Sequence, residues 1–353
     1  MKKLLKILLG IILVVIVAAA LFLVFLTLDE YRPADTEEIE VRGASSNNKV
    51  TAGETMSIIT WNVGYAGLGK DSDFVMDGGG NAPSPDREKV NSYMQGIKAA
   101  IDAEDADIYL LQEVDVNSSR SFSTDERDVF SVGNDAFALN YSCSFVPFPW
   151  PPMGKVNSGV YTTTTLDIDS AKRIALPCPF SWPLRTANLK RCMMPVYLPI
   201  EGSDKQLVAL NLHLEAYDSG EGKQAQTKVL LDFVQSEYEK GNYVIAGGDW
   251  NQTFPGTLEV YPNTHRDLWE AGCIDTNLIY EDWIVTYDAT YPTCRLLNQP
   301  YDPADTVNTQ FYVIDGFMCS PNIQIGPTET LQKNFENSDH NPVKLTFTLL
   351  PEN

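Results

Sequence analysis

The sequence predicts a layered α/β fold with mixed β-sheets, and three observations support this prediction. Short apolar runs rich in β-branched residues recur along the chain, and two longer segments have helical periodicity. Some neighbouring apolar runs are joined by a short turn, as in a hairpin, whereas others flank a helix, as in a crossover. The 353 residues, of which 44% are hydrophobic, are sufficient for a large core.

The first 28 residues differ from the rest of the chain. Lys2, Lys3 and Lys6 precede an uncharged apolar run over residues 7–28, which reaches the roughly 20 residues needed to cross a bilayer as a helix. We therefore predict a transmembrane signal anchor at residues 1–28, with a cleaved signal peptide as the alternative. Lysines before the span and acidic residues after it predict a single-pass protein of the cell membrane, with a cytoplasmic N-terminus and an extracellular catalytic domain.

The remaining chain divides into a polar segment and a folded domain. The polar residues 29–53 predict a stalk, and residues 54–353 predict the domain. We expect helices over 87–107 and 223–241, where apolar residues recur at helical spacing. Strands are expected at the apolar runs 56–63, 108–115, 158–165, 192–200, 206–214, 242–251, 311–320 and 342–350.

Polar side chains stand next to the ends of several predicted strands. They are Asn62, Glu113, His213, Asp249, Asn251, Asp315, Asp339 and His340. A single polar residue at a strand end is more often a cap or a turn than a catalyst. A whole set of acids, amides and imidazoles is a stronger signal, because loops at strand ends gather into one site in layered α/β folds.

The motifs that carry these residues resemble those of the endonuclease/exonuclease/phosphatase superfamily. They are "ITWNV", "LLQEVD", "NLHL", "GGDWN", "VIDGF" and "SDHNPV", in this order. The resemblance spans residues 56–349 and implies one domain with a four-layer α/β sandwich, in which two packed mixed sheets are flanked by helices. It also implies a metal-dependent phosphoester hydrolase, most simply a phosphodiesterase.

A divalent cation is part of this expectation. Carboxylate and amide oxygens suit a hard cation, which polarises a phosphoryl oxygen and stabilises the leaving group. We expect Glu113 and Asn62 to bind Mg²⁺, or else Mn²⁺ or Ca²⁺, and the resemblance implies that Asp339 adds to the metal shell.

The resemblance also implies catalytic roles. His340 is expected to act as general base or to stabilise the phosphorane, with its ring oriented by Asp315. Asp249 is expected to hold the nucleophilic water or to protonate the leaving group, and Asn251 to donate to a phosphate oxygen. His213 is expected to contact phosphate or to supply a proton, the alternative being a strand-end histidine paired with a neighbouring acid.

The substrate stays open at this point. A formal net charge of −21 does not suit a chain that binds long nucleic acid through its backbone. A lipid head group, a small phosphoester and nucleic acid are the candidates, so an extracellular nuclease and a catalytically silent surface-binding protein remain alternatives. The aromatic run 145–153 is either a core-packing loop or a membrane-interface loop. We expect a monomer.

Three further features leave alternatives. Arg185, Lys190 and Arg191 form either a solvated basic patch or a group of which one member reaches a phosphate. The six cysteines permit disulfides or buried free thiols. His265 matches no motif and is expected to be structural or exposed.

Overall fold

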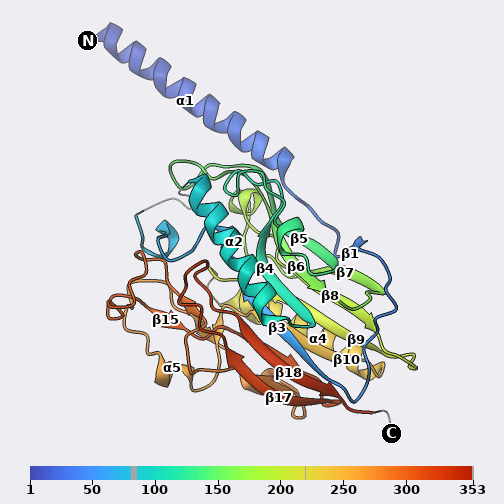
Figure 1. Cartoon of the computed structure of the whole chain (residues 1–353). Coiled ribbons are helices and arrows are strands. Elements are labelled where there is room, and N and C mark those ends of the chain that lie inside the picture. The colour runs from blue at the N-terminus through green and yellow to red at the C-terminus, as the bar shows by residue number, and fades with distance from the viewer. Residues whose placement is uncertain (81–85, 219, 352–353) are drawn as a thin grey trace.

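Two seven-stranded mixed sheets form the centre of the molecule in the computed structural model, which describes residues 1–80, 86–218 and 220–351 (Figure 1). The first sheet contains, in spatial order, β17 (Ile323–Thr330), β18 (Val343–Leu349), β3 (Thr55–Asn62), β4 (Ile108–Asp115), β6 (Gly154–Thr164), β5 (Asn134–Val146) and β2 (Val41–Arg42). The second contains β1 (Thr36–Ile39), β7 (Ser170–Ala175), β8 (Cys192–Pro199), β9 (Gln206–His213), β10 (Tyr243–Asp249), β16 (Asp315–Cys319) and β13 (Ile284–Thr286).

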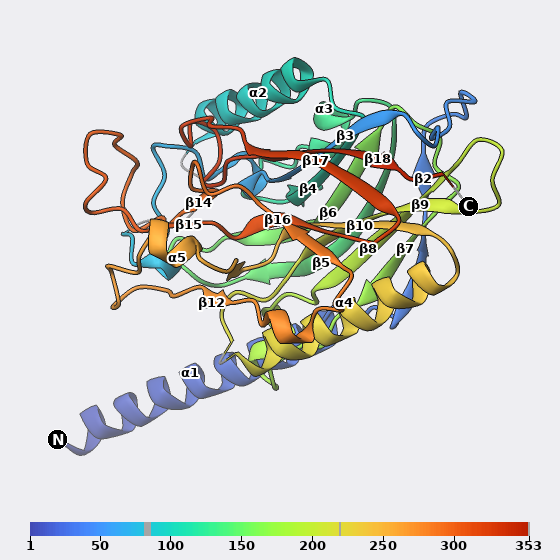
Figure 2. The same cartoon turned by 90° about the horizontal axis from the view of Figure 1, so that it is seen from below.

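Helices cover the two outer faces of the paired sheets. Figure 2 shows α2 (Arg87–Glu104) on one side and α4 (Glu221–Glu239) on the other, with the sheets between them. The largest apolar cluster lies between the sheets, and two further clusters lie beneath the helices. The predicted four-layer α/β sandwich is therefore confirmed.

Shorter elements complete the fold. They are the helices α3 (Glu126–Phe130) and α5 (Thr257–Val260), the paired strands β11 (Gln252–Thr253) and β12 (Gly272–Cys273), the paired strands β14 (Cys294–Arg295) and β15 (Phe311–Tyr312), and 3₁₀ turns at Gly64–Ala66, Val75–Asp77, Leu184–Ala187 and Thr276–Leu278.

The sequence pattern accounts for the two covering helices. The predicted apolar face of α2 is buried, and Asp86 caps the helix by accepting a hydrogen bond from the Lys89 backbone N–H. In α4, Leu230, Leu231 and Val234 are buried, whereas Phe233 is only half-buried.

Residues 36–42, inside the segment expected to be a stalk, form β1 and β2. β1 pairs antiparallel with β7 over Thr36–Ile39, and β2 pairs with β5. This part of the segment therefore extends an edge of each sheet and packs on the domain instead of forming a free stalk. Backbone pairing at a sheet edge does not require an apolar sequence, which is why composition alone misses it.

The N-terminal helix α1 (Lys2–Asp29) projects away from the sandwich (Figure 1). Within the described residues it is the one helix that is long and apolar enough to cross a membrane. Only its last turns contact the domain, where Leu26 packs in a cluster with Tyr141, Val146 and Val156. The cysteines are all free thiols, of which Cys143, Cys192, Cys294 and Cys319 are buried and Cys178 and Cys273 exposed.

Candidate active site

One cavity of about 710 Å³ brings together most of the predicted site residues. Its walls include Asn62, Glu113, His213, Asp249, Asn251, Asp339 and His340. Asp315, the eighth predicted residue, is fully buried directly behind the His340 ring. Residues from Asn62 to His340 therefore meet at one end of the paired sheets.

Strand register explains how three of these side chains become neighbours. β10 runs parallel to β9 and antiparallel to β16, and Asp249 is the register partner of both His213 and Asp315. Asp315 is the first residue of β16, whereas the sequence predicted one continuous strand over residues 311–320. The pairing of β15 with β14 separates residues 311–312 from β16. The result is a row of three titratable side chains across adjacent strands.

The loop before β18 is held in place by buried hydrogen bonds. The indole Nε1 of Trp61 donates to the His340 carbonyl oxygen at 2.9 Å. The Ser338 hydroxyl donates to the Asn62 carbonyl oxygen at 2.7 Å and accepts from the His340 backbone N–H at 3.1 Å. The serine of "SDHNPV" thus ties the loop to the end of β3, next to the predicted metal ligand.

His340 is clamped between two carboxylates. Its Nδ1 lies 2.8 Å from Asp315 Oδ2, and its Nε2 lies 3.7 Å from Asp249 Oδ2. Burial acts to lower the pKa of His340, but the charges of Asp315 and Asp249 hold this pKa well above its ordinary value. Burial raises the pKa of Asp249 to about 6, against the opposing effect of His340. The imidazole is therefore oriented by Asp315, and Asp249 faces its other nitrogen.

The Asp249 carboxylate also faces the second histidine. His213 Nε2 lies 3.4 Å from Asp249 Oδ2, so the strand-end pairing with an acid is present, and the ring also lines the cavity. Burial, with Arg191 and His340 nearby, lowers the pKa of His213 well below its ordinary value. A neutral ring at this position can either accept or donate a hydrogen bond.

Glu113 occupies an irregular position in β4. The pairing of β4 with β6 shifts register between Leu111 and Val114, and Glu113 has a φ of 57° in the left-handed region. Such a conformation costs a non-glycine residue roughly 1–2 kcal/mol. The bulge turns this side chain out of the sheet alternation, and Glu113 lines the cavity.

Asn62 links the two carboxylates on this side of the cavity. Its Nδ2 donates to Glu113 Oε1 and to Asp249 Oδ2, both at 3.1 Å. Its Oδ1 accepts from the Gly64 backbone N–H at 3.0 Å. In this arrangement the amide positions the two acids, and one lone pair of Oδ1 remains for another partner.

The donor set fits a hard cation. Burial raises the pKa of Asp339 to about 7; His340 opposes this shift and Glu113 adds to it. The acids and imidazole whose ligand atoms lie within 4.8 Å of one another are Asp249, Asp315 and His340, none of which is a predicted metal ligand. Asp315 Oδ1 is buried without a hydrogen-bond partner. So many acids crowded together out of water repel one another, and a divalent cation would relieve that repulsion.

Arg191 is a member of the predicted basic group that reaches the cavity. Its side chain is 4% exposed and lines the cavity, and its Nε is 3.6 Å from Glu215 Oε2. Its Nε and Nη1 have no hydrogen-bond partner in the described part of the chain. Of the predicted basic patch, Arg185 is partly exposed and pairs with Glu30, whereas Arg191 is a buried cation facing the site. The sequence named three basic residues together and did not distinguish which one would be buried.

The profile of the Endonuclease/Exonuclease/phosphatase family matches residues 59–321, which is more than half of the chain. The chain belongs to this family. Its members are generally phosphoester hydrolases, so the coarse class of reaction follows from membership. No functionally curated protein matches the sequence.

Solved structures share the fold at low sequence identity. An endonuclease/exonuclease/phosphatase from Beutenbergia cavernae is 16% identical with a TM-score of 0.53, over 84% of this chain and 72% of that one. One from Bacteroides vulgatus is 15% identical with a TM-score of 0.53, over 84% and 99%. ANGEL2, a 2',3'-cyclic phosphatase in complex with adenosine-2',3'-vanadate, is 14% identical with a TM-score of 0.53, over 89% and 99%. At these identities the likeness concerns the fold.

Proposed function

We propose that this protein is a divalent-metal-dependent phosphoester hydrolase, most simply of a diester, displayed outside the membrane that α1 crosses. One observation carries the proposal. His340 is bonded to Asp315 at 2.8 Å and lines the same cavity as Glu113 and Asp339. A paired imidazole for proton transfer therefore stands next to buried oxygens suited to a cation.

Glu113 and Asp339 would hold the cation, with the remaining lone pair of Asn62 Oδ1 as a third donor. When bound, the ion supplies Lewis-acid polarisation of the phosphoryl oxygen and stabilises the leaving oxygen. Asn62 also keeps Glu113 oriented through its Nδ2, because the hydrogen bond between them fixes one carboxylate oxygen.

His340 and Asp249 would manage the protons. Asp315 accepts a hydrogen bond from His340 Nδ1 and so presents Nε2 to the cavity in a fixed orientation. Nε2 and Asp249 together would position the attacking water, and one of them would remove its proton. The other role proposed for Asp249 is protonation of the leaving group.

Three side chains would bind the phosphate itself. Asn251 donates one Nδ2 hydrogen to the Leu214 carbonyl oxygen, which leaves the second for a phosphate oxygen. His213 stands beside Asp249, and Arg191 lines the same cavity with guanidinium donors that make no hydrogen bond within the described residues. A buried arginine is the strongest of these phosphate ligands, since it is charged and presents several donors.

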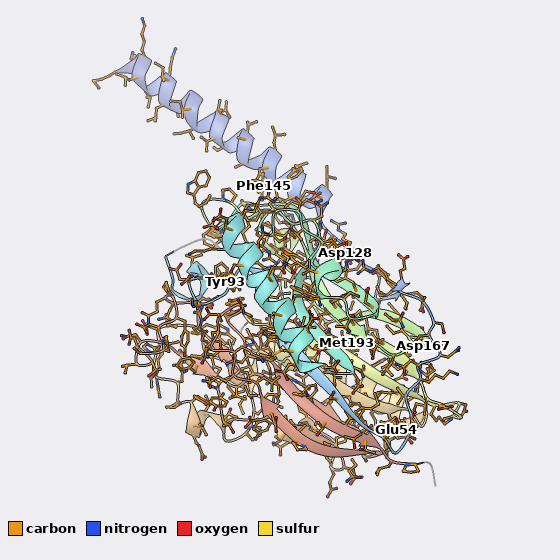
Figure 3. All side chains as sticks on the ribbon, viewed as in Figure 1. Glu54, Tyr93, Asp128, Phe145, Asp167 and Met193 are labelled. Carbon is orange, nitrogen blue, oxygen red and sulfur yellow. The ribbon has the colours of Figure 1, made fainter. Side chains whose placement is uncertain are left out.

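The test is hydrolysis of bis-p-nitrophenyl phosphate by the full chain in detergent, with Mg²⁺, Mn²⁺ or Ca²⁺ added in turn. Glu113→Ala and His340→Ala are expected to lower kcat/KM by about 10²–10⁴, as expected for loss of a catalytic group. The matched controls are Glu54→Ala and His265→Ala. Glu54, labelled in Figure 3, is exposed just before β3, at the opposite end of this strand from Asn62. His265 contacts the Val307 carbonyl oxygen and does not line the cavity.

Two results would argue against the proposal. No hydrolysis by the unmodified chain with any of the three metals would favour a catalytically silent binding protein. Equal loss in the control variants would show that the effect is not local to the site. Cleavage of plasmid DNA at rates above those for other phosphoesters would instead support the extracellular nuclease, which the net charge of −21 disfavours.

A further inference from the structure

We propose that the substrate is a lipid of the same membrane that holds α1, cleaved at its phosphoester head group. The inference rests on the proposed function, because it names the substrate class of that site. The observation behind it is that a single cavity has both catalytic groups and residues of the N-terminal helix in its walls.

The composition of the cavity wall changes from one end to the other. The catalytic end is formed by acids, amides and imidazoles, as described above. Elsewhere the wall is apolar: Phe22, Leu23 and Leu26 come from α1, and Phe148 and Leu184 from two loops of the domain. A small soluble phosphoester would leave this apolar wall unused, whereas a hydrocarbon chain would bury it.

The end of α1 is fixed on the domain by its packing. Phe22 meets the Phe145 ring edge-to-face at 6.1 Å, and Leu26 lies in an apolar cluster with β5 and β6. Figure 3 shows Phe145 beside the end of the helix that meets the domain. The part of the cavity wall that α1 contributes is therefore held in place by aromatic and aliphatic packing against the domain.

Polar contacts reinforce this joint. Asp29 accepts hydrogen bonds from the Ser144 backbone and hydroxyl, and Trp182 donates to Thr27. Next to them, the buried Glu30 carboxylate pairs with Arg32 at 3.0 Å, Arg185 at 3.2 Å and Lys190 at 3.3 Å. These contacts attach the domain directly to the end of α1. In the proposed arrangement they would hold the cavity in one orientation relative to the membrane.

The length of α1 indicates where its part of the cavity wall would lie relative to the bilayer. The helix has 28 residues, so it extends about 42 Å at about 1.5 Å per residue. A bilayer is about 30 Å thick in its hydrocarbon core and about 40–45 Å with its head groups. Phe22 and Leu26 lie within roughly 10 Å of the helix end. They therefore stand where the lipid chains meet the head groups.

The loops around this joint expose large apolar side chains. Trp150 is 86% exposed, Leu184 70%, Phe148 55% and Trp182 53%. Tryptophan and other aromatics are favoured at the membrane–water boundary, where one part of the ring is apolar and another can meet water. Within the 145–153 run, Val146 packs inward, whereas Trp150 faces outward and would be available to the membrane boundary.

These features define the proposed path of the substrate. The lipid chain would lie along Phe22, Phe148 and Leu184, and the head-group phosphate would reach His340 and Arg191. Water adds to phosphorus, one P–O ester bond breaks, and the proton from water ends on the leaving alkoxide. The hydroxyl group of the water stays on phosphorus, so the reaction balances without an oxidant or a further co-reactant.

The test compares two substrates for the full chain in nanodiscs of phosphatidylcholine, sphingomyelin and phosphatidylglycerol. Lipid cleavage is measured by mass spectrometry. Cleavage of bis-p-nitrophenyl phosphate is measured by the absorbance of the released p-nitrophenol. In the double variant Phe148→Ser/Leu184→Ser, the ratio of lipid to soluble-diester rates is expected to fall about tenfold or more, since apolar contacts to the lipid chain are lost. Val260→Ser/Val307→Ser removes two exposed apolar side chains that do not line the cavity and is the matched control.

Each outcome decides between the proposals. A lower ratio in the first double variant alone supports a lipid substrate. Soluble-diester cleavage without lipid cleavage, or an unchanged ratio in that variant, overturns the lipid substrate and leaves the proposed hydrolase intact. Cleavage of neither substrate overturns the hydrolase and the lipid substrate together.

Discussion

At the residue scale, the site is organised around the Asp249 carboxylate. It accepts hydrogen bonds from Asn62 Nδ2 at 3.1 Å and from the Asn251 backbone N–H at 2.9 Å. It also faces His213 at 3.4 Å and His340 at 3.7 Å. These contacts hold the carboxylate in one orientation, and in the proposed reaction they would fix its position relative to the phosphate.

Asp315→Asn tests the orienting role assigned to the acid behind His340. The amide has the same shape, but it no longer carries the charge that favours the Nδ1-protonated ring at 2.8 Å. We expect kcat for bis-p-nitrophenyl phosphate to fall by about 10²–10⁴ while KM changes little, because Asp315 does not line the cavity.

The control for this variant is Asp204→Asn, whose side chain is exposed in a turn. It is expected to retain the parent kcat. A denaturation curve of Asp315→Asn that matches the parent would show that the variant is folded. Full activity of folded Asp315→Asn would remove the aspartate from the catalytic machinery.

The sequence predicted residue types better than residue geometry. The order of "QE", "GDWN" and "SDH" was enough to select Glu113, Asp249 and His340, because these side chains carry the chemistry. Two features required coordinates. Asn62 turns its Nδ2 toward the carboxylates, and Arg191 is buried instead of solvated. Both depend on contacts across the two sheets, which local sequence does not encode.

At the element scale, the strands that position the site were those best predicted. β4 was predicted at its observed bounds because it is a buried apolar run closed by polar residues. β5 was missed, since Asn134–Val146 mixes polar and apolar residues on a partly exposed strand. β1 was missed because polar residues at a sheet edge are specified by pairing with β7.

The buried carboxyl group of Glu126 joins the short helix α3 to β4, and its ionisation makes this contact depend on pH. Glu126 Oε2 accepts from the Asp115 backbone N–H at 2.8 Å, while Oε1 is buried without a hydrogen-bond partner. Burial, and then the nearby Asp115 charge, raise the pKa of Glu126 well above its ordinary value. A carboxyl group with a raised folded-state pKa stabilises the fold below its unfolded pKa, and that contribution is lost as pH rises through the folded pKa.

Glu126→Gln removes this ionisation and keeps the acceptor. We expect the stability of the variant relative to the parent to increase from pH 5 to pH 8, by up to about 1.4 kcal/mol per pH unit. Urea unfolding of both chains in detergent at several pH values measures this difference. Glu88→Gln, an exposed glutamate in the first turn of α2, is expected to show no such trend. A stability difference for Glu126→Gln that is constant with pH would contradict the assigned ionisation.

At the scale of the whole molecule, the sandwich brings together residues that are far apart in sequence. β18 lies next to β3, and β16 next to β10, so the C-terminal loop with His340 returns to strands formed much earlier. The sequence predicted this return only through its family resemblance. Short-range patterns specify strands, whereas the order of strands in a sheet depends on long-range packing.

The relation between α1 and the domain was the least predictable feature. Apolar length and flanking charge predicted a membrane span, but not that its last turns would form part of a cavity wall. That arrangement depends on contacts between α1 and loops more than 100 residues away, such as Ser144 with Asp29. The polar composition of residues 29–53 pointed instead to a separating stalk.

Mn²⁺ binding to the full chain, followed by electron paramagnetic resonance, tests the convergence of these residues most directly. We expect one tight site in the parent chain and in Glu54→Ala, and an affinity about tenfold or more weaker in Glu113→Ala. The control is necessary because the chain has 47 acidic residues that bind cations weakly. An unchanged tight site in Glu113→Ala would contradict the proposed metal centre.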